Sequence, residues 1–168
     1  MYKVLLIATL GLLLMSCSST RKSTQQSTRY SKERTTSSSN NANVNSVITY
    51  AKSFEGTRYK FGGTTRSGMD CSGLVFVAFK NQNVALPRVS RDMATRGKQI
   101  NLQQTTAGDL VFFKTSKSSR NINHVGLVVE AKNGTVYFIH STTSRGVIIS
   151  SLDESYWNSA FVQVRRII

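Results

Sequence analysis

Cysteine and histidine are both scarce in this sequence of 168 residues, which contains two of each. Cys17 ends an apolar N-terminal run, whereas Cys71 lies in the middle of the chain. If Cys17 is modified when that run is removed, Cys71 is the only free thiol, and no intramolecular disulfide can form. A zinc site made of two cysteines and two histidines is excluded for the same reason.

The apolar run at the N-terminus is too short for a membrane span. It extends from Val4 to Met15 behind Lys3, whereas a transmembrane helix needs about 20 apolar residues. A short run behind a basic residue is typical of a cleaved signal peptide. Its end, Leu14-Met15-Ser16-Cys17, resembles a bacterial lipobox, which implies a lipoprotein signal peptide over residues 1–16 and lipidation of Cys17. An ordinary secretory signal that contains a cysteine is the alternative.

Acidic residues are few, and 22 Lys and Arg against 8 Asp and Glu give a net charge of +14. A strongly basic protein usually has an anionic partner, most often nucleic acid. Export argues against nucleic acid, so we attribute the charge to attraction to anionic polymers and lipids of the cell envelope. We expect a membrane anchor through the lipid on Cys17, in the outer membrane in preference to the inner, with the domain in the periplasm. Nothing in the sequence indicates an oligomeric state.

Aliphatic side chains are almost absent from residues 17–43, which we interpret as a flexible polar linker behind the lipidated cysteine. The ordered domain is predicted over residues 44–168, without internal repeats. It should begin with a helix that ends near Gly56. The apolar residues of that helix recur at the spacing of one helical face: Val44, Val47, Ile48, Ala51 and Phe54.

The rest of the domain predicts one further helix and then strands. The apolar run Leu74 to Phe79 is compatible with a buried strand, but Asp70 is a suitable N-cap and favours a buried helix. Later segments have the composition of short strands: residues 109–113, 124–130, 135–140, 147–151 and 161–168. Helices followed by antiparallel strands predict an α+β fold.

Asn133-Gly134 is a strong signal for a hairpin turn between two of those strands. Because side chains alternate along a strand, a plain two-residue turn would place His124 and His140 on opposite faces. A loop of odd length, such as one that includes Lys132, or a bulge would instead pair His140 with Gly126. A site shared by the two histidines therefore requires one of these irregularities.

Residue chemistry points to a nucleophilic thiol. Cys71 in the first turn of a helix would lie where N–H groups favour a thiolate. His124 could take the thiol proton, His140 could orient the first imidazole, and the N–H of Cys71 could stabilise an oxyanion. Taken alone, such a cysteine is more often an inert core residue, and such histidines are more often structural.

Other catalytic motifs are missing. There is no G-x-S-x-G sequence for a serine nucleophile. The glycines Gly63 and Gly68 have the spacing of a phosphate-binding loop, but Met69 stands where that loop requires lysine. The phosphate-binding interpretation is therefore excluded.

Several motifs together resemble the NlpC-type cell-wall peptidases, a papain-like family, over the domain from about Tyr50 to the C-terminus. In chain order they are Tyr59-Lys60-Phe61-Gly62-Gly63, Asp70-Cys71-Ser72-Gly73-Leu74-Val75, Leu86-Pro87-Arg88, Ala107-Gly108-Asp109-Leu110-Val111-Phe112-Phe113, His124-Val125-Gly126 and Ile139-His140-Ser141. The resemblance implies a papain-like α+β fold, with N-terminal helices packed on a small antiparallel sheet. It also implies cleavage of peptidoglycan stem peptides between the γ-carboxyl of D-glutamate and the diamino acid, for cell-wall remodelling.

The same resemblance assigns the catalytic residues. Cys71 is implied as nucleophile, His124 as base and His140 as the orienting residue, and no metal or organic cofactor is required. The segment between the two histidines is a few residues longer than in the family pattern. Ser141 or Asn123 are therefore alternatives to His140 as the orienting residue.

Five further residues are candidates for the substrate cleft. The resemblance implies this role for Tyr59, Asp70 and Ser72, although Asp70 and Ser72 also suit helix capping. Arg88 and Ser90 are expected along the substrate groove, with an ordinary surface role as the alternative. Rival functions are an amidase or acyltransferase on the same Cys-His core, or a non-catalytic peptidoglycan-binding lipoprotein.

Overall fold

The computed structural model describes residues 43–116 and 120–168, all within one compact unit, Thr36–Ile168. The predicted signal peptide, the lipidation of Cys17 and the linker up to residue 42 lie outside the described residues. None of the helices in the described part of the chain is both long and apolar enough to span a membrane.

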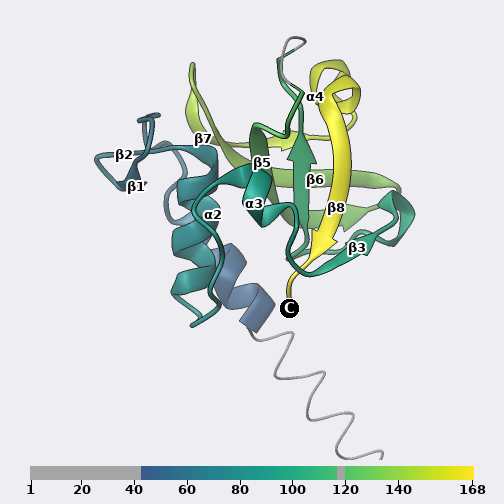
Figure 1. Cartoon of the computed structure of the whole chain (residues 1–168), viewed down its shortest axis with the longest axis horizontal. Coiled ribbons are helices and arrows are strands. Elements are labelled where there is room, and N and C mark those ends of the chain that lie inside the picture. The colour runs from purple at the N-terminus through teal and green to yellow at the C-terminus, as the bar shows by residue number, and fades with distance from the viewer. Residues whose placement is uncertain (1–42, 117–119) are drawn as a thin grey trace, which may run out of the picture. The chain divides into compact units, whose positions relative to one another are not determined.

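The domain begins with the helix that the sequence predicts. Residues 43–52 are helical, and Gly56, with a φ of +80°, lies in the turn that follows. Four of the predicted apolar positions are buried: Val47, Ile48, Ala51 and Phe54. They pack in the same hydrophobic cluster as the next helix, α2, which Figure 1 shows beside this one.

The segment Cys71–Lys80 is helix α2, as the N-cap at Asp70 predicts. Asp70 has extended backbone angles, and its Oδ1 accepts a hydrogen bond of 2.6 Å from the N–H of Gly73. Because this cap satisfies a donor that the first helical turn leaves unpaired, it fixes the start of the helix. Cys71 is therefore the first residue of α2.

The second half of the domain forms a six-stranded sheet in the order β3-β8-β4-β5-β6-β7, and every pairing in it is antiparallel. The sequence predicts five of its strands within a few residues: β4 (Leu110–Phe113), β5 (His124–Lys132), β6 (Thr135–Thr142), β7 (Gly146–Ser151) and β8 (Phe161–Arg166). It does not predict the short elements: β1 (Thr64–Thr65), β2 (Gly68–Met69), α3 (Ser90–Met93), β3 (Lys98–Ile100), the 3₁₀ helix η1 (Leu102–Gln104) and α4 (Ser155–Ala160).

Both faces of the sheet are covered. Strand β4, one of its two middle strands, is therefore buried along its whole length. Leu110 and Phe112 belong to the hydrophobic cluster that contains α2. The alternate residues Val111 and Phe113 belong to a second cluster, which includes Trp157 of α4. This division follows from the alternation of side chains along a strand, and it places α2 and α4 on opposite faces.

A bulge in the β5–β6 hairpin brings the two histidines to one face. The turn itself has only two residues, Asn133 and Gly134, with φ values of 53° and 82°, and Lys132 pairs with Thr135 across it. The loop of odd length, one of the two predicted irregularities, is therefore not formed. The register shifts between Val128 and Glu130, however, so that Leu127 pairs with Ile139. One step further along this register, His140 lies opposite Gly126, which is the pairing that a shared histidine site requires.

Candidate active site

Cys71 lies where the first turn of α2 meets the start of β5. Its sulfur accepts a hydrogen bond from the N–H of Val125 and is further approached by the N–H groups of Ser72 and of Cys71 itself. The thiol is partly exposed, since it lines a cleft of about 400 Å³ together with Tyr59 and His124. Such a volume is enough for a ligand of the size of a short peptide segment.

The two histidines are in direct contact. The Nε2 of His124 and the Nδ1 of His140 are 2.9 Å apart, and both rings are buried, with 9% and 0% of their surface exposed. If His124 donates through its Nε2–H, its Nδ1 keeps a lone pair for the proton of Cys71. His140 then carries its own proton on Nε2, which has no hydrogen-bond partner among the described residues. In this tautomer the contact with His140 holds the ring of His124 while its Nδ1 stays free to accept a proton.

The alternative orienting residues are engaged elsewhere. Ser141 donates from its hydroxyl to the carbonyl of Met69 at 2.7 Å, and Asn123 accepts from the N–H of Thr115 at 2.9 Å. The longer segment between the two histidines does not separate them, because the bulge in the β5–β6 hairpin places both side chains on the same face of the sheet. His140 is thus the residue that the structure places against His124.

Trp157 covers the histidine pair and was not predicted from the sequence. Its ring stacks on His124 with centroids 5.1 Å apart and an interplanar angle of 23°, and it meets His140 edge-on at 4.5 Å and 82°. With only 5% of its surface exposed, it excludes water from the two rings. Trp157 is the only tryptophan in the chain, but it lies seventeen residues beyond His140. No motif links it to the site, and only the packing of α4 reveals it.

Burial makes both candidate catalytic groups, the Cys71 thiol and the His124 imidazole, neutral at rest. It raises the pKa of the Cys71 thiol to about 11, although hydrogen bonds from Val125 and from the helix start act in the opposite direction. Burial also lowers the pKa of His124 to about 4. The predicted stabilisation of a thiolate by the helix start is therefore present but outweighed. At neutral pH the site holds a thiol and a neutral imidazole. The proton must therefore pass from the Cys71 thiol to His124 while the sulfur attacks.

These pKa values predict how alkylation of Cys71 depends on pH. Below a thiol pKa of about 11 the reactive thiolate fraction grows about tenfold per pH unit, so the iodoacetamide rate should rise steadily from pH 6 to pH 10. A resting thiolate–imidazolium pair would instead give a rate that is already constant near pH 6. Mass spectrometry of the labelled Cys71 peptide measures the rate, and a constant rate would contradict the neutral pair.

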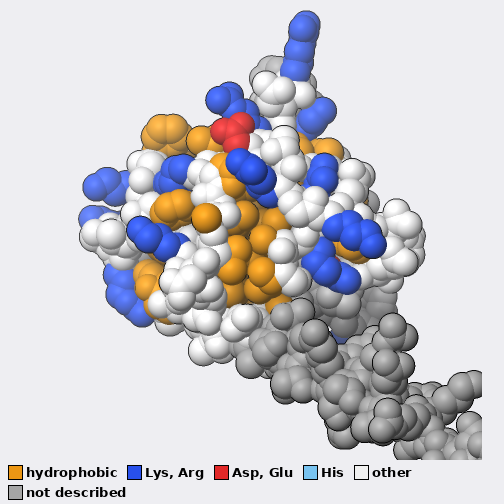
Figure 2. Space-filling model, turned by 60° about the horizontal axis from the view of Figure 1, so that its bottom comes forward, with side chains coloured by type: hydrophobic (Ala, Val, Ile, Leu, Met, Phe, Trp, Pro, Cys, Tyr) orange, Lys and Arg blue, Asp and Glu red, His pale blue; other side chains and the backbone are white. Residues whose placement is uncertain are grey.

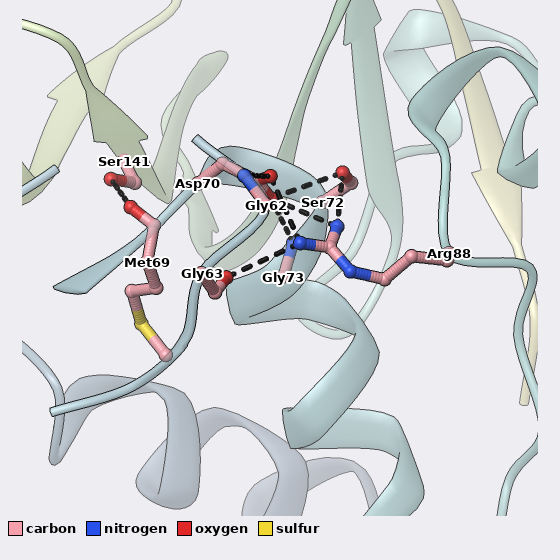
Figure 3. Close-up of polar contacts among 8 residues, drawn as sticks. All are labelled: Gly62, Gly63, Met69, Asp70, Ser72, Gly73, Arg88 and Ser141. Atoms are coloured by element: carbon pink, nitrogen blue, oxygen red, sulfur yellow. Dashed lines mark hydrogen bonds and ion pairs between the residues drawn. The ribbon is translucent and has the colours of Figure 1, made fainter. Parts of the chain in front are cut away.

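An ion pair behind the cysteine holds the start of α2 in place (Figure 3). The guanidinium of Arg88 donates to Oδ1 and Oδ2 of Asp70, both at 2.9 Å, and to the hydroxyl of Ser72 at 2.8 Å. It also reaches the carbonyl of Gly63 at 3.3 Å. A side chain on Gly73 would collide with that carbonyl, so glycine is required next to the pair.

Asp70 is charged in this network. Its burial opposes ionisation, but hydrogen bonds from Arg88 and from the N–H groups of Gly73 and Gly62 outweigh that effect and hold the pKa of the carboxyl below its ordinary value. The carboxylate thus joins the loop before the helix to the helix itself. It positions Cys71 without facing the cleft.

Loss of Arg88 should destabilise the domain. In Arg88→Gln, the buried carboxylate of Asp70 loses its cation, which should cost about 2 kcal/mol of unfolding free energy. Arg91→Gln is the matched control, because the side chain of Arg91 is 63% exposed in its contact with Asp92. Urea unfolding of both variants measures the difference, and an equal change in the two would contradict this role.

The candidate cleft residues fall into two groups. Tyr59 lines the cleft, and its pKa is raised by burial and by the nearby Cys71 and Asp70. The others are not among the residues that line the cleft: Asp70, Ser72 and Arg88 belong to the ion-pair network, and Ser90 is buried at the start of α3. Contact of these four residues with substrate stays a prediction. No cluster of three or more His, Cys, Asp or Glu suited to a metal ion occurs in the described part of the chain.

Comparison with known proteins agrees with this arrangement. The NlpC/P60 family matches residues 56–166, which include Cys71, His124 and His140. The chain belongs to the NlpC/P60 family. Its members in solved structures have the papain-like fold, with a sheet of antiparallel strands, that the sequence predicts.

Curated relatives of this chain are named endopeptidases. The chain is 46% identical to the probable endopeptidase NlpC of Escherichia coli K12, over 69% of this chain and 73% of the relative. It is 38% identical to the murein DD-endopeptidase MepS/murein LD-carboxypeptidase of the same strain, over 68% and 58%. A lipoprotein-like NLP/P60 structure from Staphylococcus aureus superposes with a TM-score of 0.66 at 29% identity, covering 76% of this chain and 42% of that one.

Proposed function

We propose that the protein is a cysteine peptidase that hydrolyses peptidoglycan stem peptides between the γ-carboxyl of D-glutamate and the diamino acid. The observation that carries this proposal is the cleft in which Cys71 and His124 meet, with His140 held against His124 at 2.9 Å. Relatives of this chain are named endopeptidases of murein or peptidoglycan. The reaction serves remodelling of the cell wall.

The geometry supports a two-step mechanism. The Nδ1 of His124 takes the proton of the Cys71 thiol while the sulfur attacks the scissile carbonyl, and the N–H of Cys71 stabilises the resulting oxyanion. His124 then gives that proton to the departing amine, which leaves a thioester on Cys71. Water, deprotonated by the same imidazole, hydrolyses the thioester and restores the thiol. His140 keeps the ring of His124 oriented through both steps.

The scissile bond is the finer part of the proposal. One relative is named a DD-endopeptidase and LD-carboxypeptidase, and another, CwlT of Bacillus subtilis, is named a muramidase/DL-endopeptidase. The γ-D-glutamyl bond follows from the family resemblance. Cleavage of D-alanyl cross-links is the competing specificity on the same site, and an amidase or acyltransferase would use the same thioester.

Product analysis separates these reactions. The full chain carrying Cys17→Ser is incubated with purified peptidoglycan and with soluble stem peptides, and the products are identified by mass spectrometry. The proposal predicts a new amino terminus on the diamino acid with both substrates and, from the soluble stem peptides, a free L-Ala-D-Glu fragment. Cleavage of cross-links alone would replace the proposed bond by the D-alanyl bond. No cleavage of any substrate would favour a non-catalytic binding protein.

We further propose a lipid anchor on Cys17, in the outer membrane, with the domain in the periplasm. The support is the motif Leu14-Met15-Ser16-Cys17 behind a short apolar run. Many Lys and Arg side chains and few acidic ones lie on the face shown in Figure 2, which suits an environment of anionic polymers. Cys17→Ser should move the protein from the membrane to the soluble fraction of fractionated cells; retention in the membrane would refute the anchor.

A further inference from the structure

A basic hollow of about 360 Å³ lies outside the catalytic cleft and takes no part in the mechanism above. It is bounded by α3, by β8 and by the segments where β4 ends and β5 begins. No Asp or Glu is among the described residues that line it. Four of the lining side chains are cationic: Arg91, Lys114, Arg120 and Arg165. The hollow therefore has a positive potential that its own lining does not neutralise.

The cations of this basic hollow are not held by strong ion pairs. Lys114, Arg120 and Arg165 form no ion pair with any residue in the described part of the chain. Arg91 approaches Asp92 at 3.4 Å, but both side chains are more than half exposed, and such a pair contributes little. All four positive charges are thus available to an anionic ligand.

Arg165 is the cation that points most clearly to an anion, because its side chain is only partly exposed. Its Nε is buried and has no hydrogen-bond partner among the described residues. Its Nη2 donates to Oε1 of Gln163 at 3.3 Å, and the amide of Gln163 donates to the carbonyl of Ala94 at 2.9 Å. A partly buried guanidinium beside a neutral amide lacks the counter-charge that normally offsets its loss of water. An anion in the hollow would supply it.

The basic hollow adjoins the catalytic cleft along two chain segments. Lys114 lines the hollow, and the next residue, Thr115, lines the cleft. In the same way, Ile122 lines the hollow and Asn123 lines the cleft. The N–H of Thr115 donates to Oδ1 of Asn123 at 2.9 Å, which holds the two segments together. One extended anionic polymer can therefore occupy both sites at once.

We propose that the basic hollow binds the carboxylates of a second stem peptide of the peptidoglycan whose first stem peptide is in the cleft. This inference rests on the proposed function, which makes peptidoglycan the substrate. Stem peptides carry free carboxylates, on D-glutamate and at the C-terminal end, and guanidinium and ammonium groups bind them through charge-assisted hydrogen bonds. A concave site beside the cleft suits a peptide better than the flat surface of a lipid bilayer. The enzyme should therefore act more efficiently on polymeric peptidoglycan than on one soluble stem peptide.

Sedimentation with insoluble peptidoglycan tests the binding. The full chain carrying Cys17→Ser and Cys71→Ala, which should bind without cleaving, is compared with the same chain that also carries Lys114→Gln and Arg120→Gln. Both of these cations are exposed, so their replacement leaves the core unchanged. The loss of two charge contacts should weaken binding about tenfold.

Two comparisons make this result specific. Lys52→Gln with Lys132→Gln removes two exposed cations that line neither the hollow nor the cleft, and it should change binding little. Peptidoglycan whose carboxylates have been amidated should bind the parent chain and the Lys114→Gln/Arg120→Gln chain equally. Equal losses in the two double variants, or a loss that persists on amidated peptidoglycan, would overturn the site. A loss of binding to phosphatidylglycerol vesicles alone would also overturn it and assign the hollow to lipid.

Hydrolysis separates this site from the proposed function. In the active chain, Lys114→Gln with Arg120→Gln should lower kcat/KM about tenfold for polymeric peptidoglycan and leave kcat/KM for a soluble stem peptide unchanged. Arg165→Gln should lower the first value in the same way. An equal loss on both substrates would overturn the hollow as a separate site. Failure of the parent chain to cleave either substrate would refute the proposed function, while sedimentation would still decide whether the hollow binds peptidoglycan.

Discussion

Cys71→Ala should abolish hydrolysis of stem peptides, with a loss of at least about 10³-fold in kcat. The thiol is the atom that forms the thioester, and no other cysteine occurs among the described residues. Folding should be retained, because Cys71 is the first residue of α2 and alanine is a good helix former. Release of peptides from peptidoglycan, followed by mass spectrometry, measures the loss.

Two controls make this result specific. Circular dichroism and the Tm of Cys71→Ala should match those of the parent protein. Cys71→Ser keeps the size of the side chain but replaces the thiol by a much weaker acid, so it should be as inactive as the alanine variant. Activity in the alanine variant within tenfold of the parent would refute Cys71 as nucleophile.

His124→Gln should reduce kcat by about 10² to 10⁴-fold, because it removes the group that takes and returns the proton. Glutamine has a similar volume, and its amide can donate to the Nδ1 of His140, which is 2.9 Å from the imidazole it replaces. Stacking against Trp157 is lost, but the buried acceptor on His140 is still satisfied. The measurement is kcat for stem peptide at pH 7 and at pH 9.

The same variant distinguishes a base from a purely structural histidine. Alkylation of Cys71 at pH 10 should change little in His124→Gln, because the thiolate then forms by ordinary ionisation. Hydrolysis should stay low at pH 9, since the leaving amine still lacks its proton donor. Parallel losses of alkylation and hydrolysis would indicate a collapsed site and contradict the assigned role.

Local patterns in the sequence predicted most of the scaffold. Asp70 as N-cap indicated the start of α2, and the strand-like composition of five segments indicated five strands of the sheet, because both signals depend on neighbouring residues. The short elements were missed, since α3 and β3 contain only four and three residues and carry too little periodicity. The order β3-β8-β4 was also beyond prediction, because it depends on pairing between distant segments.

The hairpin shows where local reasoning reached its limit. Side-chain parity predicted that His124 and His140 can share a face only if the hairpin is irregular, and the structure contains such an irregularity. Its position was not predictable, because Val129 carries no bulge signal such as glycine. The turn signal Asn133-Gly134 led us to expect the irregularity at the turn. Those two residues form an ordinary two-residue turn by themselves.

The covering residues of the site were not predictable either. Trp157 comes to the site because α4 packs its ring against His124. Arg145, in the β6–β7 turn, and Glu154, directly before α4, line the same cleft. None of them belongs to a motif near Cys71 or His124 in the sequence. The chemical groups of the reaction were predicted from residue type, whereas their surroundings required the fold.

Trapping the acyl-enzyme tests the central claim most directly. The full chain is mixed with an L-Ala-γ-D-Glu-diaminopimelate peptide, quenched in acid within the first turnover, and analysed by mass spectrometry after proteolysis. Attack by Cys71 predicts an L-Ala-D-Glu group, attached through its γ-carbonyl, on the peptide that contains Cys71. An adduct on another residue, or product release in the first turnover by a Cys71→Ala variant, would contradict the account.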